Sequence, residues 1–342
     1  MEHTFTTPAP VHLVVHNEVG HVAVSAEPTE TTTVRLEAET PDAEALVERA
    51  EVDCRPRGDT HYVVVKIPRW GGIRFLRRNG VRITVVVPEA SEVAATTASA
   101  DIEVTGTVGR ADLSTANGEA SADDVAGDVV AKTASGAITL GDVGGELRVH
   151  TSSGDLRCSR VGGRTQFTSA SGDVEIGAAG GRVEVKTASG RARLGDLSAG
   201  ARIDGVSGDV RVLGIQGGHL RVRLVSGSIS VGVAEGVDLH VDAETVSGRV
   251  SSDIPLDEAP PRQRSEEGAK VEISVRSVSG SIEIERALER VGQNLSALAE
   301  SAGVTFLTGP LHLDPGHRSI AVVDAPNVEA VTELVYDTGL SQ

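Results

Sequence analysis

The stretch that decides the fold spans residues 133–194 and reads TASGAITLGDVGGELRVHTSSGDLRCSRVGGRTQFTSASGDVEIGAAGGRVEVKTASGRARL. Ser-Gly pairs recur in it every 18 residues, at Ser135-Gly136, Ser153-Gly154, Ser171-Gly172 and Ser189-Gly190. A second glycine follows half a period later, at Gly145, Gly163 and Gly181. Each repeat is therefore two half-repeats of nine residues. Each half predicts one turn and one short strand.

Apolar and polar residues alternate after each glycine, which is the period of a strand with one buried face. Aligned with the 18-residue period, the apolar positions form three columns of apolar, mostly small aliphatic residues: Ile102, Ala120, Ile138, Leu156, Val174, Ala192, Val210; Val104, Ala122, Leu140, Cys158, Ile176, Leu194, Val212; and Leu113, Ala131, Val149, Phe167, Val185, Ile203. These columns predict a mainly β fold, a parallel β-solenoid (β-helix) of 18-residue two-strand coils. The bias of parallel crossovers favours right-handed coils.

Composition and charge narrow the classes of protein. The 342 residues include 39 Gly but only four Phe, one Trp and two Tyr, so the core is built from small side chains. No apolar run approaches the roughly 18 residues of a transmembrane segment. A net charge of −17, with no third of the chain net basic, disfavours bulk binding to nucleic acid. The N-terminus lacks the pattern of a secretion signal, and Cys54 and Cys158 are expected to be free thiols, so we expect a cytoplasmic protein.

The periodicity predicts three segments. Residues 1–93 form a β-rich N-terminal cap and the first coil or coils, with an inserted helix at 41–50 and a basic loop. Residues 94–285 form the solenoid, in which a Pro-rich loop insertion at 253–270 interrupts one coil. Residues 286–342 read as an α-β-β-α unit, half of a ferredoxin-like module, which leans on the last coil or pairs with another copy. A homo-oligomer through this module or through the solenoid ends is therefore expected.

Three clusters of polar residues have both a chemical and a structural interpretation. Asp155 and Asp173 lie one coil apart, at a spacing that suits paired acid/base work, but their column carries mixed charges and is interpreted as a solvated ladder. His312, Asp314 and His317 have ligand chemistry but read as a polar turn. A column of hydroxyl residues is interpreted as a ladder that satisfies corner backbone groups rather than as an ice-binding face: Thr97, Thr115, Thr133, Thr151, Ser169 and Thr187. We therefore predict no catalytic residue, no metal site and no cofactor.

Two rival solenoids would bring chemistry with them. Calcium β-rolls need the string G-G-x-G-x-D, and the repeats here do not contain it. Polysaccharide-cleaving β-helices have longer, three-sided coils with functional loops, for which coils this short leave no room.

One segment departs from the pattern of the rest. Residues 60–88 contain no acid, and basic residues there surround the only tryptophan. This composition is typical of a contact with an anionic membrane or with nucleic acid, although a hairpin folded over the end of the solenoid explains it as well. The candidate contact residues are Lys66, Arg69, Trp70, Arg74, Phe75, Arg77, Arg78 and Arg82.

The strings T-x-S-G-x-[IV]-x-[IL]-G and G-G-x-[VL]-x-[VL], the opening FTTPAPVHLVVHNEVGHVAV and the closing VSGSIEIER resemble the bacterial "putative adhesin" β-strand-repeat family. The likeness covers about residues 5–286, favours the branch from actinobacteria that lacks a signal peptide, and brings no catalytic residues. The tail GVTFLTGPLHLDPGHRSIAVVDAPNVEAVTELVYDTGLSQ is similar to small dimeric α/β-barrel proteins.

The sequence therefore favours a non-enzymatic scaffold that acts through protein–protein interaction or self-association in the cytoplasm, with the partner left open. The alternative is a peripheral stress or envelope protein that binds anionic membrane through the basic loop. A carbohydrate-active β-helix enzyme is the remote alternative.

Overall fold

The computed structural model describes residues 1–58, 60–68, 80–254 and 270–287. The chain divides into two units, Met1–Arg286 and Ala287–Gln342. The fold described below is that of the first unit. The predicted α-β-β-α module, with His312, Asp314 and His317, lies outside the described residues, and the bounds of the three predicted segments stay a prediction.

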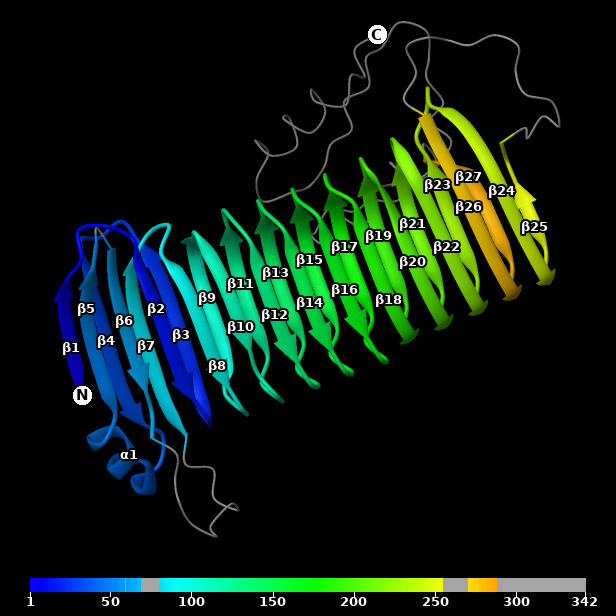
Figure 1. Ribbon diagram of the computed structural model, residues 1–342. Coiled ribbons are helices and arrows are strands. Elements are labelled where there is room, and N and C mark those ends of the chain that lie inside the picture. The colour runs from blue at the N-terminus through cyan, green and yellow to red at the C-terminus, as the bar shows by residue number, and fades with distance from the viewer. Residues whose placement is uncertain (59, 69–79, 255–269, 288–342) are drawn as a thin grey trace, which may run out of the picture. The chain divides into compact units, whose positions relative to one another are not determined.

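Two large sheets make up the described residues (Figure 1). In spatial order, the first sheet contains β1 (Glu2–Thr6), β4 (Thr31–Ala38), β7 (Val81–Pro88), β3 (Gly20–Glu27), β9 (Asp101–Val108), β11 (Ala120–Val125), β13 (Ile138–Val143), β15 (Leu156–Val161), β17 (Val174–Ala179), β19 (Ala192–Leu197), β21 (Val210–Ile215), β23 (Ile229–Val233), β27 (Ile282–Arg286) and β25 (Val250–Ser252). The second contains β24 (Asp238–Ser247), β26 (Lys270–Ser279), β22 (Gly218–Ser226), β20 (Gly200–Ser207), β18 (Val183–Ser189), β16 (Thr165–Ser169), β14 (Leu147–Thr151), β12 (Val129–Thr133), β10 (Arg110–Ser114), β8 (Glu92–Thr97), β2 (Val11–Asn17), β6 (Thr60–Lys66) and β5 (Glu51–Arg57).

Parallel pairing joins the strands of successive coils, and each sheet gives one strand to each of twelve coils. The register confirms the predicted columns: Ile102 pairs with Ala120, Ala120 with Ile138, and so on to Val210. All three columns are buried between the sheets. The predicted class, a mainly β parallel solenoid of two-strand coils, is thus confirmed, while its right-handed sense stays a prediction.

The corners between strands carry the predicted hydroxyl ladder. Thr133 Oγ1 accepts a hydrogen bond from Gly136 N at 2.8 Å, and Thr151 Oγ1 accepts one from Gly154 N at 2.7 Å. Thr115 and Ser169 do the same in their coils. A Cβ added to Gly136 would lie 1.7 Å from the carbonyl oxygen of Gly118 in the coil before. Glycine is therefore needed here because neighbouring corners approach each other closely.

The N-terminal end confirms the predicted helix and shows an unexpected order of coils. A 3-10 turn (η1, Pro41–Ala43) leads into α1 (Glu44–Glu48), which buries Leu46 and Val47. The coil β2–β3 does not lie at the end of the stack, because β6 and β7 pair on its outer side. Antiparallel strands β1, β4 and β5 lie beyond them. The chain therefore forms the coil β2–β3 first, then the cap strands β4 and β5, and then the coil β6–β7. This second coil lies between the cap and β2–β3.

The C-terminal end repeats this inversion. Strand β26 pairs with both β22 and β24, and β27 pairs with both β23 and β25. The last coil in sequence, β26–β27, therefore lies inside the stack, and β24–β25 forms its end (Figure 1). The insertion at 253–270 was predicted to interrupt one coil, but a complete coil lies on each side of it.

Candidate binding surface on the last coils

The aspartate column takes part in backbone hydrogen bonding. Asp155 Oδ1 accepts a hydrogen bond from Asp173 N at 2.9 Å, and Asp173 Oδ1 accepts one from Arg191 N at 2.7 Å. Asp101 and Asp209 accept the equivalent amides in their coils, and Asp128 accepts the Glu146 amide at the opposite corner. Each carboxylate thus satisfies a corner amide of the next coil. This geometry supports the ladder interpretation over an acid/base pair.

Asp173 is also held in its ionised form. Partial burial acts to raise the pKa of its carboxyl group, but the backbone amide and guanidinium group of Arg191 outweigh burial and lower the pKa. The guanidinium Nη2 lies 2.8 Å from Oδ2 of Asp173. A carboxyl group with a lowered pKa is a poor proton donor near neutral pH.

The corner changes its chemistry in the last coils. Corners up to Gly190 follow a small residue, as in Thr133-Ala134-Ser135-Gly136, whereas later corners have valine in that position. From Gly190 onward the glycine amide donates to the neighbouring coil's serine carbonyl, as from Gly208 N to Ser226 O at 3.1 Å. Gly208, Gly227 and Gly280 adopt φ of 137, 136 and 139°. The strands consequently extend through the serine, and the valine before it points outward.

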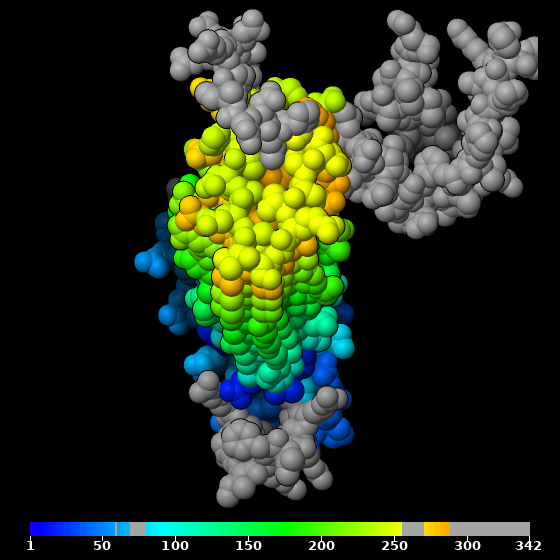
Figure 2. All heavy atoms as spheres, turned by 90° about the vertical axis from the view of Figure 1, so that its right-hand side faces the viewer, coloured from blue at the N-terminus to red at the C-terminus, as the bar shows by residue number. Residues whose placement is uncertain are grey.

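Four such valines form the valine column, one from each of β20, β22, β26 and β24: Val206, Val225, Val278 and Val246, exposed by 53, 49, 50 and 80%. Serines of the four corners flank the column on one side, and a row of outward residues with balanced charge flanks it on the other: Asp204, Arg223, Arg276 and Glu244. Figure 2 looks onto the end of the stack that β24 and β25 form. The inward residues of β24, among them Leu239, Val241 and Ala243, are only partly buried there.

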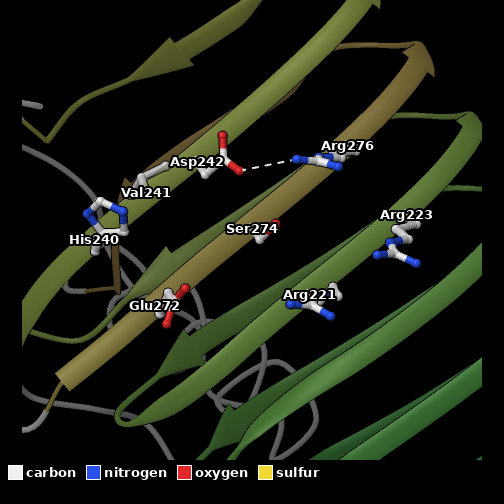
Figure 3. Close-up of a pocket in the computed structure, with 8 residues that line it drawn as sticks. All are labelled: Arg221, Arg223, His240, Val241, Asp242, Glu272, Ser274 and Arg276. Carbon is white, nitrogen blue, oxygen red and sulfur yellow. Dashed lines mark ion pairs between the residues drawn. The ribbon is translucent and has the colours of Figure 1, made fainter.

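A shallow depression of about 500 Å³ lies beside this column on the outer face of the same sheet (Figure 3). Its floor comes from three neighbouring strands: Arg221 and Arg223 on β22, Glu272, Ser274 and Arg276 on β26, and His240, Val241 and Asp242 on β24. Arg276 lies 3.7 Å from Asp242 and 3.6 Å from Glu244. We call the eight residues that line this depression the arginine patch.

The predicted contact residues of the basic loop are mostly outside the described residues. This holds for Arg69, Trp70, Arg74, Phe75, Arg77 and Arg78. Lys66 and Arg82 are exposed on β6 and β7, which belong to different sheets, so the structure does not bring these two together. Arg82 lies 3.4 Å from Glu39.

Neither the valine column nor the arginine patch was predicted as a site. A signal for both exists in the sequence. The string Val-Ser-Gly replaces Ala-Ser-Gly from Val206 onward, and residues 210–234 contain no acid while carrying Arg211, Arg221 and Arg223.

The remaining chemistry of the described residues is limited. Within them, no group of three or more His, Cys, Asp or Glu side chains is placed to hold a metal ion. No helix in that part of the chain is long and apolar enough to cross a membrane. Cys158 is buried and Cys54 half-buried, and both are free thiols. Burial raises the pKa of the Cys158 thiol to about 12.

Two parallel sheets, laddered corners and a core of small aliphatic residues define an adhesin-like β-solenoid scaffold. The chain belongs to the Toastrack DUF4097 family, whose profile matches residues 56–285.

The solved structures that match this chain come from several bacteria. A "putative adhesin" from Bacteroides fragilis is 13% identical with a TM-score of 0.35, covering 83% of this chain and 96% of its own. A "putative lipid binding protein" from Parabacteroides distasonis is 14% identical with a TM-score of 0.31 and the same two coverages. A "putative cell adhesion protein" from Clostridium sporogenes is 11% identical with a TM-score of 0.24, covering 84% and 99%. No curated protein matches this chain significantly.

Proposed function

We propose that this protein is a non-enzymatic scaffold that self-associates through the valine column. The observation that carries the proposal is the alignment of Val206, Val225, Val278 and Val246 on four adjacent strands, each about half exposed or more. Contiguous exposed apolar side chains on a soluble protein mark interaction surfaces. Strands in a sheet lie about 4.8 Å apart, so the four side chains form a straight, evenly spaced row.

A second copy is the occupant that the surroundings favour. The chain carries a net charge of −17, so most of its surface repels another copy. The valine column is an exception, because serines flank it on one side and a balanced row of two acids and two arginines on the other. Two columns related by a twofold axis can therefore interdigitate without uniform charge repulsion. The row is short, which predicts a weak, concentration-dependent dimer.

Analytical ultracentrifugation over a range of concentrations tests self-association. We expect the wild type to shift from monomer toward dimer as its concentration rises, and the variant Val225→Ser/Val278→Ser to stay monomeric. The matched control Ala116→Ser/Ala134→Ser changes the equivalent corner position in earlier coils and should behave as wild type. A wild type that stays monomeric throughout, or a valine variant that dimerises as strongly as wild type, would refute the proposal.

The proposed compartment is the cytoplasm, and the proposed mode of action is non-catalytic. Two free thiols, one of them in the core, support a reducing environment. The hydrogen-bonded aspartate column supports a structural role for the most suggestive carboxylates. Fractionation of native cells, with immunodetection of this chain, tests the compartment.

A second candidate function is peripheral binding to anionic membrane through the segment from Lys66 to Arg82. The acid-free composition of residues 60–88 supports it. Cosedimentation with anionic vesicles tests it, using Arg74→Glu/Arg77→Glu/Arg78→Glu as the variant. Equal sedimentation of the variant and the wild type would remove this candidate.

A further inference from the structure

We propose that the arginine patch is a binding site for a phosphate or sulfate ester of a polyhydroxylated compound, with Arg221, Arg223 and Ser274 as its oxyanion donors. This inference is independent of self-association. It begins from the register of three neighbouring strands. Arg221 pairs with Ser274 and Arg223 with Arg276 across β22 and β26. On the other side of β22, Arg221 pairs with Arg202 and Arg223 with Asp204.

The charges in this patch are unevenly compensated. Arg202 Nε lies 2.7 Å from Asp204 Oδ2, and Arg276 is held between Asp242 and Glu244. Glu272 lies 2.8 Å from His219. Within the described part of the chain, Arg221 and Arg223 have no carboxylate within 4.0 Å. Two uncompensated guanidinium groups thus stand side by side on a protein of net charge −17.

Each of these two arginines also faces another arginine on a neighbouring strand. Arg221 is the register partner of Arg202, and Arg223 that of Arg276. Like charges placed directly opposite each other in a sheet are destabilising. Acids already offset the charges of Arg202 and Arg276, whereas Arg221 and Arg223 keep theirs. A bound anion therefore offsets the repulsion that remains in the patch.

The spacing favours a tetrahedral oxyanion. Residues two apart on a strand lie roughly 6.6–6.8 Å apart on the same face, and the next strand lies about 4.8 Å away. A phosphate or sulfate between Arg221 and Arg223 therefore has both guanidinium groups within reach. Guanidinium groups bind such oxyanions with two parallel hydrogen bonds. The Ser274 hydroxyl on the adjacent strand provides a third donor, and a tetrahedral anion has enough oxygen atoms for all three.

The rest of the depression suits the polyhydroxylated part of the ligand, to which the phosphate or sulfate group is attached. Its volume of about 500 Å³ falls in the usual range for small-molecule sites. The far side presents the carboxylates of Asp242 and Glu272 (Figure 3). Carboxylates accept hydrogen bonds from hydroxyl groups and repel a second anion. An ester with one anionic end and one hydroxyl-rich end matches both halves of the depression.

Isothermal titration calorimetry at low salt tests the site, with glucose 6-phosphate, inorganic phosphate and glucose as probes. We expect saturable binding of glucose 6-phosphate, weaker binding of phosphate and none of glucose. Arg221→Gln/Arg223→Gln should weaken binding by about tenfold or more, because charged hydrogen bonds are lost. The matched control Arg157→Gln/Arg211→Gln removes two arginines of the other sheet that do not neighbour each other and that, among the described residues, have no carboxylate within 4.0 Å. It should bind as wild type does.

Thermal unfolding separates a binding role from a structural one. Without ligand, the Arg221→Gln/Arg223→Gln variant should unfold at the wild-type temperature or higher, because like-charge repulsion is relieved. Glucose 6-phosphate should raise the unfolding temperature of the wild type and of the control, but not that of the patch variant. A patch variant that unfolds at a lower temperature without ligand, and loses binding for that reason, contradicts the proposal.

Two further measurements show whether the ester is a lipid headgroup and distinguish this proposal from that of self-association. Vesicles containing phosphatidylinositol 4-phosphate test whether the ester is a lipid headgroup; sedimentation with them, lost in the patch variant, would assign the lipid form. The Val225→Ser/Val278→Ser variant should keep anion binding even where it abolishes self-association. Absence of saturable binding to every anionic probe, or equal weakening in the patch and control variants, would overturn the anion site.

Discussion

Arg223 of β22 and Arg276 of β26 are register partners on neighbouring strands, although β23, β24 and β25 all lie between them in the sequence. This pairing exists because the coil β26–β27 is inserted between β22–β23 and β24–β25. The inserted coil brings together the valine column and the arginine patch.

Truncation should show how far the end of the stack depends on the inserted coil. A chain ending at Ala287 keeps every strand of the described residues, and we expect it to unfold cooperatively near the wild-type urea midpoint. A chain ending at Ile254 lacks β26 and β27, so β24 and β25 lose their only strand neighbours in the described structure. We expect a lower midpoint and loss of solubility. Similar midpoints for the two truncated chains would contradict the observed order of coils.

Gly136→Ala should destabilise the fold strongly. The new Cβ would lie 1.7 Å from the carbonyl oxygen of Gly118, and neighbouring coils on both sides prevent the corner from moving away. We expect a loss of about 2–3 kcal/mol in the free energy of unfolding, measured in urea. The control Ala134→Ser, at an exposed position where the next coil has Ser152, should change little. A wild-type midpoint for Gly136→Ala would show that the corners are not tightly stacked.

Thr151→Val and Thr187→Val form a matched pair. Thr151 Oγ1 accepts the amide of buried Gly154, so valine leaves that amide without a partner and should cost about 1–2 kcal/mol. Thr187 Oγ1 is buried and has no hydrogen-bond partner in the described part of the chain, because Gly190 N donates to Ser207 O instead. Its replacement by valine should therefore be neutral or stabilising. Equal losses for the two variants would refute the structural role of the ladder.

Glu184 should make stability depend on acid pH. Hydrogen bonds from Lys186 and Arg164 lower the pKa of its carboxyl group from 4.5 to about 2. Because the folded-state pKa is below the unfolded one, this stabilisation is complete above pH 4.5 and is lost as the pH falls toward 2. Over that window, Glu184→Gln should lose less stability than wild type. Urea midpoints at several pH values test this.

The control for that series is Glu119→Gln. Glu119 is exposed on a corner, and no cation lies within ion-pair distance of its side chain among the described residues. Its pH profile should parallel that of wild type. If Glu184→Gln also parallels wild type, the two cations do not hold the Glu184 carboxylate.

The core could be predicted from sequence because one period repeats along the chain. Ile138 and Leu156 occupy the same column at a spacing of 18 residues, and parallel pairing without a slip follows from that spacing. The role of Thr133 could be predicted in the same way, since the repeats from Thr115 to Thr187 place a hydroxyl residue three positions before the corner glycine.

The order of coils at the two ends could not be predicted in this way. Strand β26 has the same inward pattern as β22 and β24, so the periodicity allows it to lie on either side of β24. The candidate surface depends on that order, because it decides which residues become neighbours. Arg223 and Arg276 are unremarkable outward residues until the register brings them together.

The inverted order at both ends also has a mechanical consequence. In a simple solenoid the terminal coil can peel away alone, because it contacts only one neighbour. Here the coils nearest the two termini in sequence, β2–β3 and β26–β27, each lie between two others. A force applied through residues 11 and 286 would load interior coils held by neighbours on both sides. Such a chain resists unzipping from either end and yields only at a higher force.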